Sequence, residues 1–298
     1  MVLRAIQGVF IIFVIAILIM FFKDYGKNKE KDVNGKQMAG NYFIGFITNF
    51  FDTLGIGSFA PTMALFKLTK LVPDRLIPGT LNVGDSIPVI LEAFIFITVI
   101  KVETITLVLM LAAGVLGGFL GVKFCKELPE RGIRSTMAIG LLIAAILMVC
   151  SKFGWIPAGG TAIGLTGVKL VIGVVANFIL GCLLPLGIGN YAPCMVIVYL
   201  LGMSPAVAFP LMMGSGAIVL CASSIRFIPA GYYHRKASWG LISAGIIGVL
   251  IAAYIVKSLP LSALQWLVIL VITYTSIQMF YQVLKGSNKS KPKAKAEV

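Results

Sequence analysis

The chain has 298 residues, of which 59% are hydrophobic and only 12% are charged. A soluble domain carries roughly a quarter charged residues, so this composition excludes an ordinary soluble protein and indicates an integral membrane protein. The formal charge of +14 would suggest nucleic-acid binding in a soluble protein. Here Lys and Arg gather in short loops and in the C-terminal tail, where they orient helices and meet anionic lipid. We therefore expect a protein of the plasma membrane with no nucleic-acid partner.

The first apolar segment, residues 5–22, leads directly into a basic polar loop that ends at residue 37. The segment is long for a signal peptide, and no cleavage site of small residues precedes Lys23, so it predicts an uncleaved membrane helix. Further apolar segments follow at residues 78–100, 104–122, 135–151, 206–228, 238–256 and 261–284. Since a span requires about 20 mainly apolar residues, each of these segments predicts a membrane crossing.

The sequence repeats itself at an offset of 132 residues, because LGIGSFAP begins at residue 54 and LGIGNYAP begins at residue 186. In the same register, Pro73, Pro78 and Gly84 correspond to Pro205, Pro210 and Gly216. Chance can supply one matching octapeptide, but it does not supply three further prolines and glycines in one register. The sequence therefore predicts an internal duplication.

The distribution of positive charge predicts how the two copies are oriented. If each motif is the tip of a re-entrant hairpin, loops 23–37, 67–75, 123–134 and 226–236 and the tail after residue 284 share one side with 20 of the 25 Lys and Arg residues. If each motif region crosses the membrane instead, the split is 16 to nine. Positive residues concentrate on the cytoplasmic side, so the hairpins are favoured. The copies are then inverted, with the N-terminus outside and the C-terminus in the cytoplasm.

The predicted fold is an all-α integral membrane protein with two inverted repeats and one extra N-terminal helix. Each repeat consists of a re-entrant helical hairpin followed by three transmembrane helices. The parts are the N-terminal helix with its basic cytoplasmic loop (1–37), the first repeat (38–151), the second repeat (152–285) and a basic cytoplasmic tail (286–298). Inverted repeats with broken helices that meet near the midplane are a recurring plan of secondary transporters.

The repeated motif predicts a half-helix that begins inside the membrane. Two glycines two residues apart permit backbone angles that other residues resist, Ser58 and Asn190 are typical N-cap residues, and a proline follows within the first turn, where its missing N–H costs little. Such a helix start offers free backbone N–H groups and a positive dipole end, which together bind anions. No Lys or Arg lies near the middle of a predicted span, so we expect these dipoles to hold a small anion without a full positive charge.

The alternative is that the glycines only allow close helix packing, as small residues often do in membranes. A motif that is present twice favours the binding interpretation. The residues expected to bind the anion come from both tips and from the spans that follow them: Asp52, Gly55, Gly57, Ser58, Asn82, Gly187, Gly189, Asn190 and Ser215.

Three acidic residues lie inside apolar segments of the first copy. Asp52 precedes the motif by two residues, while Asp85 and Glu92 are seven residues apart and so lie on one helical face. An ionisable group inside the bilayer is expensive and marks a functional site by default. We expect Asp85 and Glu92 to carry a coupling ion, either a proton or sodium. The alternative is a protonated carboxyl group that is hydrogen-bonded to a neighbouring helix.

The duplicated Gly-x-Gly-x-x-Ala-Pro motifs and the stretch LLGMSPAVAFPLMMGSGA at residues 200–217 resemble the TauE/SafE sulfite-exporter family of membrane permeases. The resemblance covers nearly the whole chain from about residue 40. It implies transport of a small anion such as sulfite, a sulfonate or a related organic acid, often coupled to an ion gradient. Many members carry a more glycine-rich GIGGG-like motif, whereas Ser58-Phe59 and Asn190-Tyr191 follow the second glycine here. The particular anion therefore stays open.

Two other functional classes stay open at this point. A passive anion channel could use the same dipole site. A membrane enzyme is a poor fit, because the chain has no GxxxxGK[ST], HExxH or GxSxG motif and its only histidine lies in a basic loop. The cysteines show no CxxC spacing, so neither a disulfide framework nor zinc is predicted. We expect no catalytic residue, metal or cofactor, and the sequence leaves association into a homo-oligomer open.

Overall fold

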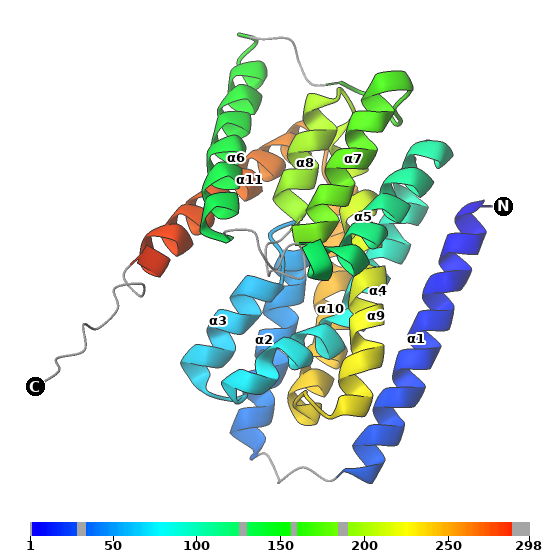
Figure 1. Cartoon of the computed structure of the whole chain (residues 1–298), viewed down its shortest axis with the longest axis vertical. Coiled ribbons are helices and arrows are strands. Elements are labelled where there is room, and N and C mark those ends of the chain that lie inside the picture. Colours follow the sequence, from blue (N-terminus) through cyan, green and yellow to red (C-terminus); the bar gives the residue numbers. More distant parts are fainter. Residues whose placement is uncertain (1, 29–33, 125–129, 156–159, 184–189, 288–298) are drawn as a thin grey trace, which may run out of the picture.

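A computed structural model describes residues 2–28, 34–124, 130–155, 160–183 and 190–287 of the chain. Within these residues the fold is all-helical, as the sequence predicts, with no strand and one isolated β-bridge between Ala162 and Met203. The helices shown in Figure 1 are α1 (Val2–Lys27), α2 (Gly35–Thr53), α3 (Phe59–Thr69), η1 (Asp74–Leu76), α4 (Ile77–Val99), α5 (Thr104–Phe124), α6 (Glu130–Lys152), α7 (Gly167–Leu183), α8 (Tyr191–Leu200), η4 (Pro205–Val207), α9 (Ala208–Ala230), α10 (Arg235–Ser258) and α11 (Leu261–Ser287).

The order of the helices repeats as the sequence does, because α2 to α6 recur as α7 to α11. Adding 132 to Gly35 and Phe59, the first residues of α2 and α3, gives Gly167 and Tyr191, the first residues of α7 and α8. The bounds of the later helix pairs agree with the same offset to within three residues. The recurring unit is therefore a broken helix pair followed by three long helices.

The two copies pack mainly against each other. Helix α2 packs on α10 and, in the corresponding contact, α5 packs on α7, while α4 packs on α9 and α6 on α11. Helices α4 and α9 are antiparallel, since Gly214 near the start of α9 lies beside Ile97 near the end of α4, and Gly79 lies beside Phe227. In Figure 1, α2 and α3 occupy the lower end of the molecule and α7 and α8 the upper end. This arrangement agrees with inverted copies, whose orientation in the membrane stays a prediction.

Glycines bring the helices of the two copies close together. A Cβ atom at Gly117 of α5 would lie 2.1 Å from the Phe178 carbonyl oxygen of α7, and one at Gly45 of α2 would lie 2.6 Å from the Gly240 carbonyl oxygen of α10. Small residues at helix crossings let backbones approach closely in membranes. These glycines therefore have the packing role that we considered as the alternative for the motif glycines.

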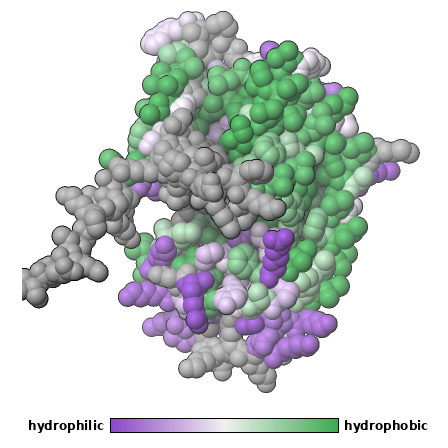
Figure 2. Space-filling model, viewed as in Figure 1, coloured by the Kyte–Doolittle hydropathy of each residue, from purple (hydrophilic) through white to green (hydrophobic). Residues whose placement is uncertain are grey.

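The outer surface is strongly apolar, with hydrophilic residues gathered at the lower end of the view in Figure 2. On α1, Ile12 is 67% exposed and Ile19 is 62% exposed, as expected for a helix that faces lipid. Within the described residues, the helices long and apolar enough to cross a membrane are Val2–Lys27, Ile77–Val99, Pro205–Ala230, Arg235–Val256 and Gln265–Leu284. The expected spans at 104–122 and 135–151 form α5 and α6, whose described apolar stretches are shorter, Thr104–Leu120 and Ala138–Cys150. The chain is a multi-pass membrane protein.

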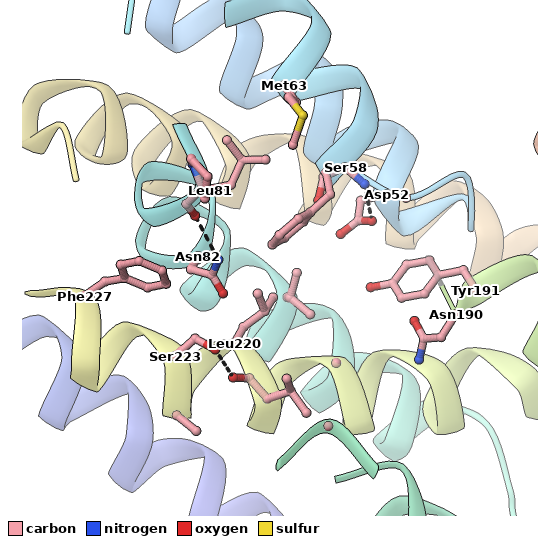
Figure 3. A pocket seen from close by; sticks show the side chains of 18 of the residues that line it. Asp52, Ser58, Met63, Leu81, Asn82, Asn190, Tyr191, Leu220, Ser223 and Phe227 are labelled. Atoms are coloured by element: carbon pink, nitrogen blue, oxygen red, sulfur yellow. Dashed lines mark hydrogen bonds between the residues drawn. The ribbon is translucent and has the colours of Figure 1, made fainter. Parts of the chain in front are cut away.

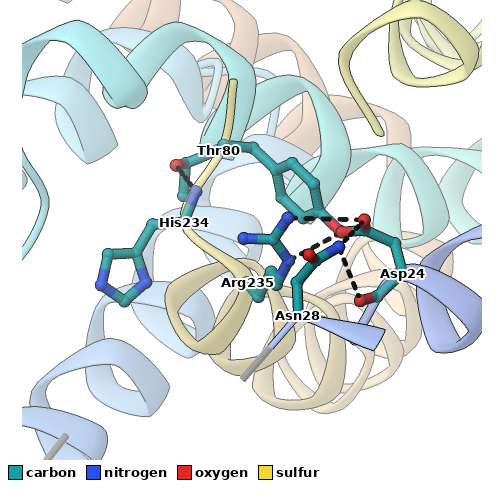
Figure 4. A network of polar contacts seen from close by, with 6 residues as sticks. Asp24, Asn28, Thr80, His234 and Arg235 are labelled. Atoms are coloured by element: carbon teal, nitrogen blue, oxygen red, sulfur yellow. Dashed lines mark hydrogen bonds and ion pairs between the residues drawn. The ribbon is translucent and has the colours of Figure 1, made fainter. Parts of the chain in front are cut away.

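A polar network ties the end of α1 to the connection between α9 and α10 (Figure 4). The Asp24 carboxylate accepts hydrogen bonds from the Tyr233 hydroxyl at 2.6 Å and from Arg235 Nε at 2.7 Å, and Asn28 donates to it at 2.8 Å. Two of the loops that the charge count assigns to the cytoplasm, 23–37 and 226–236, therefore meet at one end of the molecule.

Candidate functional site

The first motif breaks a helix pair, as its glycines predict. Helix α2 ends at Thr53 and α3 begins at Phe59. Between them Gly55 has φ +95° and Gly57 has φ +90°, a region that residues with a Cβ atom rarely adopt. The Gly55 N–H donates to the Asp52 carbonyl oxygen at 2.7 Å, which ends α2 with a tight turn. The chain then reverses into α3 through Ser58.

The N-terminus of α3 is capped differently from our expectation. Ser58 occupies the N-cap position, but its side chain makes no capping hydrogen bond. Its backbone N–H instead donates to Asp52 Oδ1 at 2.7 Å. The expectation that this N–H is free for an anion is therefore wrong, because a carboxylate six residues earlier already accepts its hydrogen bond. Asn190 is likewise the N-cap residue of α8 without a side-chain capping bond.

A cavity of about 570 Å³ lies where the start of α3 meets the start of α8 (Figure 3). Five of the residues predicted to bind an anion line it: Asp52, Gly57, Ser58, Asn82 and Asn190. Asp52, Ser58 and Asn190 are each 2% exposed, so these polar groups face the cavity within the protein interior. Most of the remaining lining is apolar, with Ser223 and Thr275 as further polar contributors.

Four other predicted residues do not line this cavity. Gly55 lies against the Met195 side chain. The Ser215 hydroxyl donates to the carbonyl oxygens of Leu211 and Met212 in its own helix, as serines inside helices commonly do. Asp85 and Glu92 are fully buried in α4 and face α2. Gly187 and Gly189 of the second motif lie outside the described residues.

The three acidic residues inside the apolar segments of the first copy, Asp52, Asp85 and Glu92, form a buried carboxyl cluster with polar residues of α2. Asn49 Nδ2 donates to Asp85 Oδ1 at 3.2 Å, and the Thr53 hydroxyl donates to Glu92 Oε1 at 2.7 Å. The second carboxyl oxygen of each of the three acids has no hydrogen-bond partner. A buried acceptor without a partner costs free energy, so each of these oxygens is suited to receive a proton or to meet a ligand that donates.

The charge balance of this cluster sets it apart from the structural ion pair at Asp24. Within the described residues, no basic side chain bonds to Asp52, Asp85 or Glu92, and no group of three His, Cys, Asp or Glu side chains is placed to hold a metal ion. The arrangement therefore suits reversible proton binding. An isolated ionised carboxylate in a dry interior is costly, whereas a neutral acid costs much less.

Besides Ser223 and Thr275, sequence reasoning missed two residues of the cavity that carry a hydroxyl or a charge suited to act on an anion. Tyr191 follows Asn190 in the second motif, where the first motif has Phe59, and its hydroxyl points toward Asp52 (Figure 3). Arg226, in the last two turns of α9, also lines the cavity and has an exposed side chain. Arg226 thus places a full positive charge at the margin of the cavity, whereas the sequence predicted a site without one. The substitution of Tyr for Phe within the repeat was the available signal for Tyr191; Arg226 was assigned to a loop.

The comparison with protein families agrees with the resemblance seen in the sequence. The model of the family described as Sulfite exporter TauE/SafE matches residues 1–148. The match begins earlier than residue 40 and contains the first motif and all three buried acids. It ends before the second copy, so it does not extend over nearly the whole chain, and residues 200–217 lie outside it. No curated protein and no solved structure matches the chain.

Proposed function

Since the match over residues 1–148 identifies the chain as a member of the TauE/SafE sulfite-exporter family, we propose that it is a secondary transporter of a small anion, with sulfite or an organic sulfonate as the substrate class. The observation that carries this proposal is the convergence of the two motifs. The N-cap residues of α3 and α8, Ser58 and Asn190, line one cavity although they are 132 residues apart.

The electrostatics of the cavity favour a small anion that binds reversibly. Two helix N-termini contribute the positive ends of their dipoles. The amide of Asn82 lines the cavity and has a second N–H besides the one that it donates to the Pro78 carbonyl oxygen, whereas the Ser223 hydroxyl donates to the Val219 carbonyl oxygen of its own helix. Arg226 adds a full positive charge at an exposed position of the lining, where solvent weakens its attraction. Weak attraction allows the anion to leave again, as a transport cycle requires.

The buried carboxyl cluster supports coupling to a cation, and we propose a proton. Asp85 and Glu92 lie behind the cavity lining rather than in it, which suits groups that respond to the substrate without contacting it. With Asp52 they place three acids beside an anion site. Ionised acids would repel the substrate, so binding of the anion and binding of a proton support each other.

We further propose that the copies are inverted about an axis in the membrane plane, with the N-terminus outside and the C-terminus in the cytoplasm. The antiparallel packing of α4 and α9 supports the inversion. The meeting of loops 23–37 and 226–236 at one end supports their assignment to a single side. In this arrangement the cavity lies at the junction of the two copies, where transporters of this architecture bind their substrates.

The experiment that tests the function has two steps on purified full-length protein. A thermal-shift panel should include sulfite, sulfate, methanesulfonate, acetate and chloride, because a ligand that binds only the folded state raises its stability. The anion that stabilises most is then followed in liposomes with and without a pH gradient. We expect accumulation that is driven by the gradient. Flux that ignores the gradient would indicate a passive channel, and an absence of binding and flux for all the anions would refute the proposal.

A further inference from the structure

Among the described acids, only Asp52 both lines the cavity and accepts a backbone hydrogen bond at the start of α3. Its carboxylate lines the cavity, and its Oδ1 accepts the Ser58 backbone N–H at 2.7 Å at the start of α3. Both residues are 98% buried, and Asp52 Oδ2 has no partner. A carboxylate at a helix N-terminus satisfies the same donor and the same dipole that a bound anion would use. The protein thus carries its own anion at the proposed binding position.

We propose, building on the anion-transport function above, that the Asp52 carboxylate is a built-in competitor of the substrate. While Asp52 is ionised, it occupies the Ser58 N–H and adds a negative charge to the cavity. When Asp52 takes up a proton, the carboxyl group becomes a neutral and weaker acceptor, and the Ser58 N–H becomes available to the substrate anion. One proton then accompanies one anion. Coupling arises because both ligands act on a single hydrogen-bond donor.

The geometry gives this exchange room to occur. A Cβ atom built on Gly57, the residue immediately before Ser58, would meet nothing within 4 Å, so open space borders the donor. The short loop from Leu54 to Gly57 contains two glycines with positive φ, which lets the carboxylate of α2 reach the first turn of α3. The Tyr191 hydroxyl points toward the same carboxylate from α8 (Figure 3) and can donate to it in either protonation state.

The titratable groups around Asp52 define what the experiment must separate. Helix α4 contributes Asp85 and Glu92, α8 contributes Tyr191, and α9 contributes Arg226 at the cavity lining. Helix α10, which packs on α2, has no titratable side chain between residues 239 and 253, and α3 has none in its first two turns. A pH effect on anion binding could therefore come from the charge of any of the three acids.

The test measures the affinity of methanesulfonate, whose charge is constant in this range, for the purified full-length chain from about pH 5 to about pH 8. For the wild type we expect the affinity to fall as pH rises, by up to about tenfold per pH unit where Asp52 loses its proton. Asp52→Asn should bind with an affinity that is nearly independent of pH. Glu92→Gln removes a carboxyl of the same cluster but leaves Ser58 untouched. It should therefore move the pH at which the affinity changes but keep the slope of affinity against pH.

A second pair of variants tests the shared donor itself. Ser58→Pro removes the backbone N–H, and the φ of −79° at this position is close to the value that proline imposes. Ser58→Ala keeps the N–H and removes only the hydroxyl. We expect Ser58→Pro to bind weakly at every pH with a flattened slope. Ser58→Ala should bind with lower affinity, because Ser58 lines the cavity, but should keep the pH slope of the wild type.

Each outcome decides the matter. If the affinity of Asp52→Asn or Ser58→Pro depends on pH as steeply as that of the wild type, Asp52 does not compete with the anion. The same conclusion follows if Glu92→Gln, rather than Asp52→Asn, flattens the pH dependence of affinity. In these cases the anion still binds and the proposed function stands. If the wild type binds methanesulfonate, sulfate and sulfite at no pH, the proposed function fails and the competition fails with it.

Discussion

Replacing Gly57 by valine tests whether the motif glycines border a binding site or merely permit a turn. Gly57 lines the cavity at φ +90°, and a Cβ atom there would meet open space. The substituted side chain would therefore project into the volume that we assign to the anion. We expect Gly57→Val to abolish anion binding while the protein still folds.

The cost to stability can be set apart from the cost to binding. A Cβ atom in the left-handed region costs roughly 1–2 kcal/mol per residue, and no neighbouring atom adds a clash. Gly154 offers the same conditions away from the cavity, since it has φ +75° and open space around its Cβ position. Gly154→Val should thus lose a similar amount of stability and keep its anion affinity.

Both variants and the wild type would be purified in detergent and compared in two measurements. Thermal unfolding without ligand should show a similar decrease for the two variants. Titration with the best anion of the panel should show binding by Gly154→Val and none by Gly57→Val. If Gly57→Val binds with the affinity of the wild type, the anion does not sit at the first motif. If both variants lose binding, the strain rather than the position is responsible.

Three further predictions concern coupling, capture and topology. Glu92→Gln should fold normally but change the pH profile of transport in liposomes, since it removes a buried acid beside Asp52; an unchanged profile would assign Glu92 a structural role. Arg226→Gln should weaken anion binding about two- to fivefold and reduce the salt dependence of binding, because the lost charge is exposed. Arg226→Lys keeps the charge and serves as the control. If the wild type and both variants bind with equal affinity, Arg226 does not contribute to the site. In a cysteine-free background, a cysteine in place of exposed Lys101 should react with an impermeant thiol reagent added outside, whereas one in place of exposed Lys70 should not. The reverse labelling would show that the protein lies in the membrane with the opposite orientation.

The sequence predicted those features of the fold that depend on local chemistry or on the repeat. Two glycines and a following proline mark the break between α2 and α3, because few other residues tolerate these backbone angles. The seven-residue spacing of Asp85 and Glu92 placed both on one buried face of α4, as helical periodicity requires. The offset of 132 residues anticipated the bounds of the helices in the second copy.

The details of the site could not be read from the sequence, because they depend on contacts between distant elements. The path of a four-residue loop decides that Asp52, rather than the Ser58 side chain, caps α3. Ser215 faces its own helix because its hydroxyl can reach carbonyl oxygens three and four residues earlier. Arg226 joins the cavity only because α9 packs on α4. None of these outcomes follows from spacing alone.

The two copies share a fold but not their charges, and this asymmetry fits a coupled transporter. The positions that correspond to Asp85 and Glu92 are Ala217 and Ser224. A full second set of acids would surround one anion cavity with up to six carboxyls, and their repulsion would oppose the substrate.

The second copy instead supplies Tyr191, whose hydroxyl points across the junction toward Asp52 of the first copy. In transporters built from inverted repeats, one repeat rocks against the other during the cycle. Such a movement would change how closely the phenol approaches the carboxyl group. A proton on Asp52 would therefore alter a contact between the moving parts, so that its uptake biases the conformational equilibrium as well as the occupancy of the anion site.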